Sequence, residues 1–383
     1  MHRCPDKRIS ILFVIDALTF GGGERVFAQI ISALPIQKYE IYLASLPNKQ
    51  FYEAIQNDHV HFLPIDFSNT ISFTLVTKLA KILRQNHIEI VHGQGARAEV
   101  YARIGKRLAR RSRYVSTVAM PVEGFDVAPV RKRIYRFFDR ISETFVDRFL
   151  VVSDALRQAM IEGHGIPAEK VIRIYNGVEI GHFSPQKRNE ARKRIRQEFS
   201  VGENTLLVGA IGRLVWQKGF EYLVQAIPMV LNKFPKAQVL IVGEGPIKHH
   251  LEALSHKLKI GRHLIFAGFR KDIKQILSAI DMLVIPSVLE GFPIITLEGM
   301  AMTKPIIATN IDGIKEQIID GKTGILIPHK DPSAIAEAIL KLSKDEQCAQ
   351  NIGWEARKRV EKEFSLEKMV NTTEQIYQSL ISL

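Results

Sequence analysis

Cysteine and long apolar runs are what this chain most plainly lacks. Cys4 and Cys348 are the two cysteines in 383 residues, and a disulfide framework needs more cysteines at closer spacing. We therefore expect a reducing, cytoplasmic setting. The sequence has no run of about 18 apolar residues, so no membrane-spanning helix is predicted. Residues 1–15 lack the apolar length and the small-residue cleavage site of a signal peptide.

Patterns of metal ligands are missing as well. The sequence contains no Asp-x-Asp, and its twelve histidines form no ligand-spaced cluster with cysteines or acids. The glycine triplet at residues 21–23 does not have the G-x-G-x-x-G spacing of a dinucleotide site. We expect neither a metal ion nor a bound cofactor.

What the chain has instead is a regular alternation of apolar runs and helical patterns. This alternation predicts parallel βαβ units, and the length favours two domains. Glycine, proline and a charged run between residues 178 and 198 separate two patterns that each begin with a strand and a glycine-rich turn. We expect domains at residues 1–180 and 181–365, and a carboxy-terminal helix at 366–383.

The fold class expected from this pattern is α/β, with two Rossmann-like sheets. The strands expected in the first half are Ile9–Ile15, Glu40–Leu46, His59–Ile65, Ile88–His92, Tyr114–Val118, Phe149–Val152 and Val171–Tyr175. Those expected in the second half are Thr205–Ile211, Gln238–Val242, Leu264–Ala267, Met282–Ile285, Ile306–Thr309 and Gly324–Ile327.

Positive charge is concentrated in one segment. The net charge is +13, and residues 103–140 hold eleven Lys or Arg against three acids, which is +8 over 38 residues. Apolar residues lie among these cations: Ile104, Leu108, Ile134, Phe137, Phe138 and Ile141. A basic stretch with apolar partners is typical of contact with an anionic membrane, although it also fits a solvated face over a core. We find no aromatic-rich basic motif of a nucleic-acid binder.

The most informative segment is residues 281–301, DMLVIPSVLEGFPIITLEGMA. A short apolar strand runs into a tight loop, and a helix begins near Ile294. Ligands of open α/β sheets bind beyond the carboxyl ends of the strands, and a helix N-terminus at that edge suits phosphate. Glu290 in the loop and Glu298 in the helix are therefore candidate ligand contacts. Taken alone, they also fit a solvated loop acid and an acid that complements the helix dipole.

This segment resembles the signature of glycosyltransferase family 4, whose members are retaining enzymes of the GT-B fold. Further matching stretches are GAIGRLVWQKGF at 209–220, VLIVGEGP at 239–246, YNGV at 175–178, LTFGGGER at 18–25 and LVVSDA at 150–155. The resemblance spans nearly the whole chain and is more specific in the second half. It implies two Rossmann-like domains facing across a cleft, with the acceptor on the first domain and the nucleotide-sugar donor on the second. It also implies that the carboxy-terminal helix crosses back to the first domain.

The resemblance also implies roles for particular residues. Arg213 and Lys218 would bind the donor diphosphate in place of a metal ion. Glu298 would bind ribose hydroxyls, and Glu290 and His92 would position the transferred sugar and the acceptor. The other donor-binding residues that it implies are Gly22, Gly23, Gly212, Gly243, Glu244, Gly245, Phe269, Arg270, Gly291, Phe292, Pro293 and Ile294.

Several of these positions have a second interpretation from the residues alone. Arg213 and Lys218 also fit two solvated loop cations. The stretch 243–246, Gly-Glu-Gly-Pro, also fits a plain turn, and Phe269 also fits an ordinary strand boundary. His92 ends an expected strand, where a histidine either faces a ligand or serves the structure.

We predict a retaining, metal-independent glycosyltransferase. It would move a hexose-type sugar from a UDP- or GDP-sugar to a saccharide or lipid-linked acceptor, in the assembly of cell-surface polysaccharide or lipopolysaccharide. The nucleotide sugar is a substrate, so no cofactor is expected. We expect a cytoplasmic protein that contacts the inner face of the plasma membrane through residues 103–140 and binds no nucleic acid. The alternatives are a sugar-nucleotide epimerase or a glycogen-synthase-like polymerase of the same fold, and a non-catalytic sugar-nucleotide binder.

Overall fold

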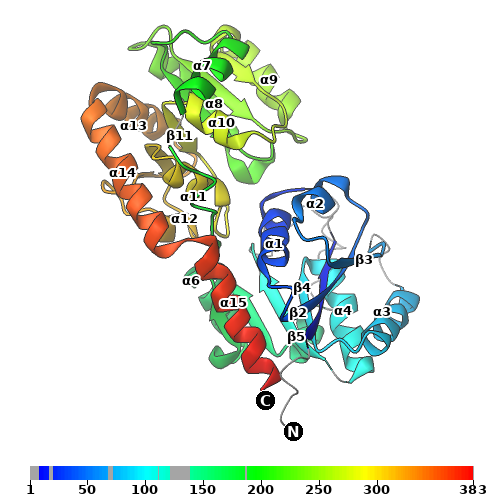
Figure 1. Ribbon diagram of the computed structural model, residues 1–383. Helices are drawn as coiled ribbons and strands as arrows, with labels where there is room; N and C mark the ends of the chain where they lie inside the picture. The colour runs from blue at the N-terminus through cyan, green and yellow to red at the C-terminus, as the bar shows by residue number, and fades with distance from the viewer. Residues whose placement is uncertain are drawn as a thin grey trace. The chain divides into compact units, whose positions relative to one another are not determined.

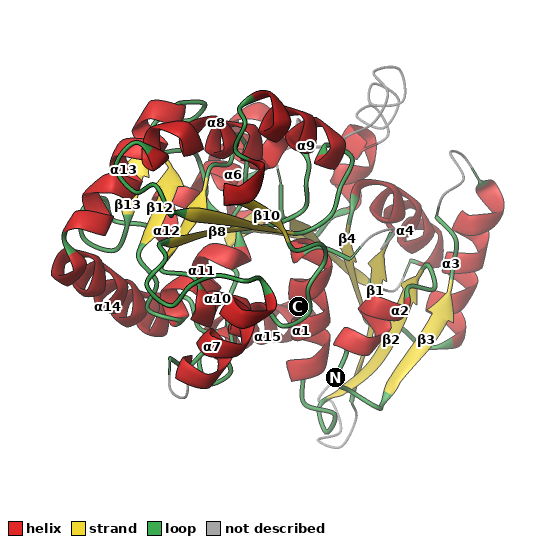
Figure 2. Ribbon diagram, turned by 90° about the horizontal axis from the view of Figure 1, so that it is seen from above, coloured by secondary structure: helices red, strands yellow, loops and turns green. Residues whose placement is uncertain are grey.

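The chain folds into two compact units. The computed structural model describes residues 8–16, 20–67, 72–110, 112–120, 139–185 and 188–382. The first unit comprises residues 1–175 together with 367–383, and the second comprises residues 176–366. Each unit is a parallel sheet with helices on both of its faces (Figures 1 and 2).

The first unit is built on a seven-stranded sheet with the order β3-β2-β1-β4-β5-β6-β7. Its strands are β1 (Ile9–Ile15), β2 (Tyr39–Ser45), β3 (Val60–Pro64), β4 (Ile90–Gln94), β5 (Arg113–Val118), β6 (Arg148–Val151) and β7 (Val171–Arg173). Its α-helices are α1 (Gly22–Ala33), α2 (Lys49–Ala54), α3 (Phe73–Gln85), α4 (Ala96–Ala109), α6 (Asp154–Gln158) and α15 (Leu366–Ile381). All seven residues of β1 are buried, because helices cover both faces of the central strands.

The helices of the first unit form two layers. α1 contacts α2, and α3 contacts α4. Right-handed crossovers place the two pairs on opposite faces of the sheet. α15 lies on the α1 face, where the Tyr377 ring meets His92, and His92 in turn meets Phe27 of α1 (Figure 1). The predicted return of the carboxy-terminal helix to the first domain is thus confirmed.

The second unit is built on a six-stranded sheet with the order β10-β9-β8-β11-β12-β13. Its strands are β8 (Leu207–Ile211), β9 (Gln238–Val242), β10 (Leu264–Phe266), β11 (Met282–Ile285), β12 (Ile306–Thr309) and β13 (Ile325–Ile327). Its α-helices are α7 (Arg188–Glu198), α8 (Phe220–Leu231), α9 (Lys248–Lys257), α10 (Ile273–Ala279), α11 (Ile294–Ala301), α12 (Ile314–Gln317), α13 (Pro332–Lys344) and α14 (Glu346–Glu363). α8 and α13 pack together over the core, where each fully buried Leu or Ile contributes about 1.5–3 kcal/mol.

The predicted strands are confirmed, each within two residues of its expected ends. No helix was predicted for the charged run after residue 185. Residues 188–198 form α7, which packs against α10 within the second unit. Arg192 and Arg196, one turn apart, each donate to a different oxygen of Asp281 at 2.8 Å. This shared carboxylate fixes a highly charged helix to the sheet.

Candidate functional site

The switch point of the second sheet lies between β8 and β11. From β8 the chain continues outward through β9 and β10, and it then returns to β11 on the other side of β8. In open α/β sheets, ligands bind beyond the carboxyl ends of the strands at such a reversal. The loops at this edge are residues 212–219 after β8, 243–247 after β9, 267–272 after β10 and 286–293 after β11.

These loops are joined by backbone hydrogen bonds. The Leu214 N–H donates to the Glu244 carbonyl at 2.9 Å, and the Val288 N–H donates to the Gln217 carbonyl at 2.7 Å. The loop after β8 is therefore held from both sides. A ligand at the switch point would meet a surface whose shape is already fixed, so little ordering cost opposes binding.

The glycines after β9 are required for this packing. A Cβ at Gly243 would lie 1.9 Å from the Gly212 carbonyl oxygen, and one at Gly245 would lie 2.3 Å from the Leu214 carbonyl oxygen. Gly243 also has a φ of +141°. Close packing against the backbone thus explains why both residues are glycine. This agrees with the interpretation of residues 243–246 as a turn. Glu244, between them, is exposed and pairs with Lys248.

Lys218 and Glu290 meet at the switch point. The Lys218 Nζ lies 2.5 Å from the Glu290 Oε1, and the Ser287 hydroxyl donates to the same oxygen at 2.8 Å. Glu290 is only 5% exposed. The pair forms because Gly219 has a φ of +61° and its missing Cβ would lie 2.1 Å from the Pro286 carbonyl oxygen. The loop after β8 therefore lies directly on the loop after β11.

Glu298 lies inside α11, the helix that begins at this edge. It is 2% exposed and stands in the second turn of the helix. The preceding loop is tied down, since the Asn176 side-chain amide donates to the Phe292 carbonyl at 2.8 Å and Gln317 donates to the Pro293 carbonyl at 2.9 Å. The structure thus brings Lys218, Glu290 and Glu298 to one edge, as the sequence predicted.

The other residues predicted at this edge differ in exposure. Gly291, Phe292, Pro293 and Ile294 are all buried, and the Phe292 ring packs on Phe364 at a centroid distance of 5.4 Å. These four residues shape the loop and the start of α11. Arg213 and Phe269 are exposed, and Gly212 is half-buried.

Arg270, which was predicted at the donor, is paired with two acids in the structure. Its guanidinium donates to Asp272 from Nε at 2.8 Å and to Glu198 from Nη2 at 3.1 Å. The hydrogen bond with Arg270 lowers the pKa of Asp272. Arg270 therefore binds the end of α7 to the loop after β10.

The predicted role of His92 in positioning the sugar and the acceptor is wrong, because its side chain is fully buried. Its Nδ1 lies 2.5 Å from the Tyr377 hydroxyl and its Nε2 lies 2.7 Å from the Thr117 hydroxyl. Burial lowers the pKa of His92 to about 3, so the ring is neutral. Side chains alternate along a strand, and β4 turns His92 toward α1 and α15 instead of toward the ligand edge.

The first sheet has its own switch point between β1 and β4, and two residues there were not predicted from the sequence. Asp16 follows β1, and its Oδ2 lies 3.3 Å from the Nε of Arg97 in α4. A Cβ at Gly95, whose φ is +96°, would lie 2.2 Å from the Asp16 Oδ1. Burial raises the pKa of Asp16. Their positions directly after the carboxyl ends of two strands are the signal that could have found them.

The predicted glycines of the first half lie beside this pair. Gly22 and Gly23 are the first two residues of α1, and a Cβ at Gly23 would lie 2.8 Å from the side-chain nitrogen of Gln94 at the end of β4. Glu24, the third residue of α1, accepts a hydrogen bond from the Gly21 N–H at 2.9 Å. Gly23 therefore allows a close approach between α1 and β4.

The basic segment 103–140 is not a uniform solvated face. Arg103 is 2% exposed and donates to Glu99 at 2.8 Å and to Asp139 at 2.5 Å. Burial raises the pKa of Glu99 to about 7. Lys106 pairs with Asp147 at 3.0 Å. Arg103 is internal and Lys106 is held by an ion pair, so neither is a free docking cation.

The rest of that segment is only partly described. Residues 111 and 121–138 lie outside the described residues, and with them Ile134, Phe137, Phe138 and five of the eleven cations of the segment. Among the described residues, Leu108 is 41% exposed and Ile141 is 50% exposed.

The described residues contain no group of three or more His, Cys, Asp or Glu side chains placed to hold a metal ion. In the same part of the chain, no helix is long and apolar enough to cross a membrane.

Two family models match the chain, one on each unit. Residues 20–182 match Glycosyltransferase Family 4, and residues 191–359 match Glycosyl transferases group 1. With two Rossmann-like units and the switch-point site, these matches define the class as a glycosyltransferase of the GT-B fold. The chain belongs to the family 4 glycosyltransferases with a group 1 carboxy-terminal domain.

Individual relatives agree with this membership. An uncharacterized glycosyltransferase of Methanocaldococcus jannaschii is 30% identical over 60% of this chain and 59% of its own length. The UDP-Gal:alpha-D-GlcNAc-diphosphoundecaprenol alpha-1,3-galactosyltransferase of Escherichia coli is 23% identical over 98% of each chain. The crystal structure of HepE from Anabaena, in complex with UDP-glucose, superposes with a TM-score of 0.84 at 22% identity, over 98% of this chain and all of HepE. The last likeness shows the fold.

Proposed function

We propose that the switch point of the second sheet binds a nucleotide-diphosphate sugar and that the enzyme transfers its hexose with retention of configuration. The observation that carries this proposal is the convergence of Lys218, Glu290 and Glu298 from β8, β11 and α11. The Lys218 ammonium, held in place by the Glu290 carboxylate, can bind a diphosphate. The buried Glu298 carboxylate at the same edge can accept hydrogen bonds from a diol. The N-terminus of α11 adds backbone N–H groups for phosphate.

In this proposal Glu290 presets the ammonium group of Lys218. One of the three N–H groups of the Lys218 ammonium then donates a hydrogen bond to the donor diphosphate, while Glu290 keeps the side chain in place. Arg213, exposed on the same loop, adds a planar guanidinium for phosphate oxygens. Charge grows on the diphosphate as the sugar leaves, and donors already in position stabilise that charge without reorganising. Glu298 accepts hydrogen bonds from ribose hydroxyls and takes no part in the bond changes.

The proposed reaction proceeds on one face of the sugar. The bond from the anomeric carbon to the diphosphate oxygen breaks, and a bond from the acceptor hydroxyl oxygen to that carbon forms on the same side. The acceptor proton passes to the leaving phosphate oxygen. No residue of the site is required as a covalent nucleophile, and Lys218 and Arg213 supply the positive charge that a metal ion supplies elsewhere.

The names of two relatives favour particular donor and acceptor substrates within this proposal. HepE is seen with UDP-glucose, and the Escherichia coli relative is named for transfer from UDP-Gal to a sugar on diphosphoundecaprenol. We therefore propose a UDP-hexose donor ahead of a GDP-hexose. We propose a saccharide or lipid-linked acceptor, bound by the first unit, in the assembly of cell-surface polysaccharide or lipopolysaccharide. Such an acceptor would bring a cytoplasmic enzyme to the inner face of the plasma membrane.

A thermal-shift panel of UDP-, GDP- and ADP-sugars tests the donor site. A ligand that binds the native state raises the melting temperature with concentration, by RT ln(1 + [L]/Kd) in free energy. We expect a UDP-hexose to give the largest, saturable rise, and to be turned over when a labelled acceptor mixture is added. No rise with any nucleotide sugar would contradict the proposal.

A further inference from the structure

The outer surface of α3 carries a stripe of cations with an apolar end. Phe73, Thr77, Lys81 and Arg84 follow each other at intervals of four, four and three residues, so they share one side of the helix. The buried residues Val76, Leu79, Ala80 and Leu83 lie on a different side of the helix. The Phe73 ring is 75% exposed. The apolar side of α3 therefore packs against neighbouring elements, and its basic side faces the solvent.

α4 extends this surface. The guanidinium of Arg84 donates to the Leu108 carbonyl at 2.7 Å, which places the end of α4 beside the stripe. Leu108 is 41% exposed, and the side chains of Arg107 and Arg110 are exposed next to it. We call the exposed residues of these two helices the α3–α4 face: Phe73, Lys78, Lys81, Arg84, Arg107, Leu108 and Arg110.

No acid offsets the charge of this face from its own helices. α3 contains no Asp or Glu, and the single acid of α4, Glu99, is buried and paired with Arg103. Five exposed cations with two exposed apolar side chains complement an anionic bilayer, which offers negative headgroups above an apolar interior.

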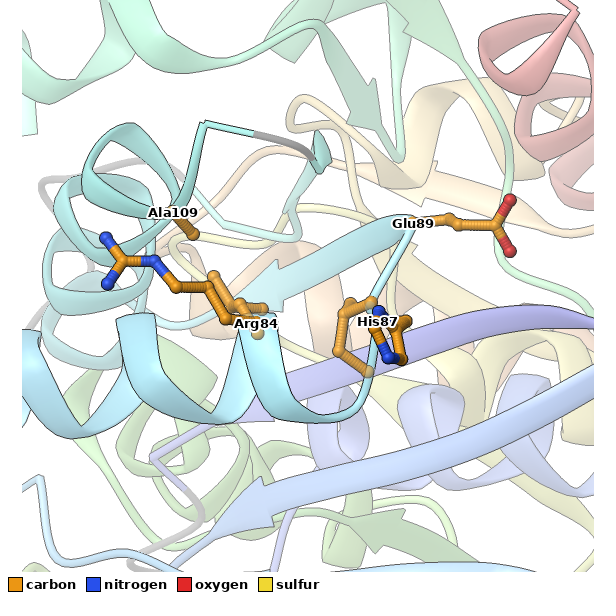
Figure 3. Close-up of a pocket in the computed structure, with 6 residues that line it drawn as sticks. Arg84, His87, Glu89 and Ala109 are labelled. Atoms are coloured by element: carbon orange, nitrogen blue, oxygen red, sulfur yellow. The ribbon is translucent and has the colours of Figure 1, made fainter.

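A pocket at one end of the face does not account for it. This pocket is lined by Leu83, Arg84, His87, Ile88, Glu89 and Ala109, and Figure 3 shows Arg84 and Glu89 extending in opposite directions with His87 between them. It lies at the amino end of β4, away from the ligand edge, and the Glu89 carboxylate disfavours an anion inside it. Phe73, by contrast, begins the helix that leaves the carboxyl side of β3. The apolar end of the stripe is therefore the end nearer the ligand edge of the first unit.

We infer that the α3–α4 face docks the protein on an anionic lipid bilayer. The inference rests on the proposed lipid-linked acceptor, and it joins α3 to the exposed end of α4, which is the part of residues 103–140 that carries Arg107, Leu108 and Arg110. The cations hold the headgroups, and Phe73 and Leu108 enter the interface. The Phe73 end of this face is the end nearer the ligand edge of the first unit, and the cations beside Leu108 lie at its other end.

Vesicle sedimentation tests the inference. Vesicles of phosphatidylcholine with about 30% phosphatidylglycerol should bind the full-length protein, and pure phosphatidylcholine should not. Each cation near an anionic surface contributes about fivefold in affinity, so the triple variant Lys78→Glu, Lys81→Glu, Arg107→Glu should bind at least about a hundredfold more weakly. A matched triple reversal of exposed lysines in the second unit, Lys233→Glu, Lys236→Glu, Lys257→Glu, should keep most of the binding. Salt should weaken wild-type binding, because charges in water are screened over about 8–10 Å.

A second variant keeps the test decisive if the triple variant misfolds. Phe73→Trp should fluoresce from within the bilayer, and brominated phosphatidylglycerol should quench it. Equal wild-type binding to neutral and anionic vesicles, equal loss in both triple variants, or an unquenched Trp at position 73 would each overturn the inference. Nucleotide-sugar binding is measured on the same variants and should not change, so a failed docking surface is told apart from a failed donor site.

Discussion

Replacing either Lys218 or Glu290 also affects the other residue, because their charges neutralise each other and Glu290 is almost fully buried. Lys218→Ala leaves the buried Glu290 carboxylate with the Ser287 hydroxyl but without its cation. We expect a loss of about 1–3 kcal/mol in stability, less than for a fully buried pair because the Lys218 side chain is 22% exposed. We also expect kcat to fall about 10²–10³-fold, since a preset donor to the leaving group is lost.

A double variant separates these two effects. Lys218→Met with Glu290→Gln removes both charges, so its melting temperature should return toward that of the wild type while transfer stays slow. Recovery of transfer in this double variant would show that the pair serves stability and not the leaving diphosphate.

His92 gives stability a defined pH dependence at the residue scale. The native pKa is about 3, whereas an unfolded histidine titrates near 6.5. Between these two pH values, His92 binds a proton in the unfolded chain but not in the native one. The free energy of unfolding therefore falls as the pH drops below about 6.5, by up to about 1.4 kcal/mol per pH unit. Urea unfolding of His92→Gln between pH 4 and 7 should show a shallower slope than the wild type. His249→Gln, at a side chain that is 94% exposed, should match the wild-type slope.

At the scale of elements, a short pairing holds the two ends of the second unit together. Val178 donates to the Phe364 carbonyl at 3.0 Å, and Leu366 donates to the Val178 carbonyl at 3.0 Å. A Cβ at Gly177 would lie 2.6 Å from the Ser365 carbonyl oxygen, whereas one at Gly181 would meet no atom within 4 Å. Gly177→Ala should therefore cost about 1–3 kcal/mol by denaturant unfolding, and Gly181→Ala should cost little. Equal effects would contradict this packing account.

The strands could be predicted because an apolar run between turn residues needs no knowledge of the rest of the fold. α7 could not, because a helix of charged residues such as Arg192 and Arg196 is stabilised by Asp281, which lies more than eighty residues away. The same limit applies to His92. Its position on a strand was evident, but its burial depends on α15, which returns from the far end of the chain.

The donor edge was more predictable than the rest of the site. Glu290, Glu298 and Lys218 lie in loops and a helix start that follow their strands directly, so strand order alone brings them together. Asp16 and Arg97 obey the same rule, but neither belongs to a recognisable short motif. The pairing of Arg270 with Glu198 could not be predicted, because Glu198 ends α7, a helix that the sequence pattern did not indicate.

For the molecule as a whole, we predict that transfer does not depend on a divalent ion. In the proposed site, Lys218 and Arg213 would supply the charge that such an ion would supply to the diphosphate. Initial rates with a labelled donor should therefore be the same, within about twofold, in EDTA and in Mg²⁺. Activity lost in EDTA and restored by Mg²⁺ or Mn²⁺ would contradict a leaving-group site built from Lys218 and Arg213.

The central claim is that the nucleotide of the donor lies at the switch point of the second sheet, with Glu298 on its ribose. Calorimetric titration of UDP into three proteins tests it most directly: the wild type, Glu298→Ala, and the control Glu337→Ala, which removes an exposed acid of α13. Loss of a buried charged hydrogen-bond partner costs about 1.5–3 kcal/mol, so UDP should bind Glu298→Ala about 10–150-fold more weakly than the wild type. Glu337→Ala should bind like the wild type. Wild-type affinity for UDP in Glu298→Ala, with its fold intact, would contradict the account.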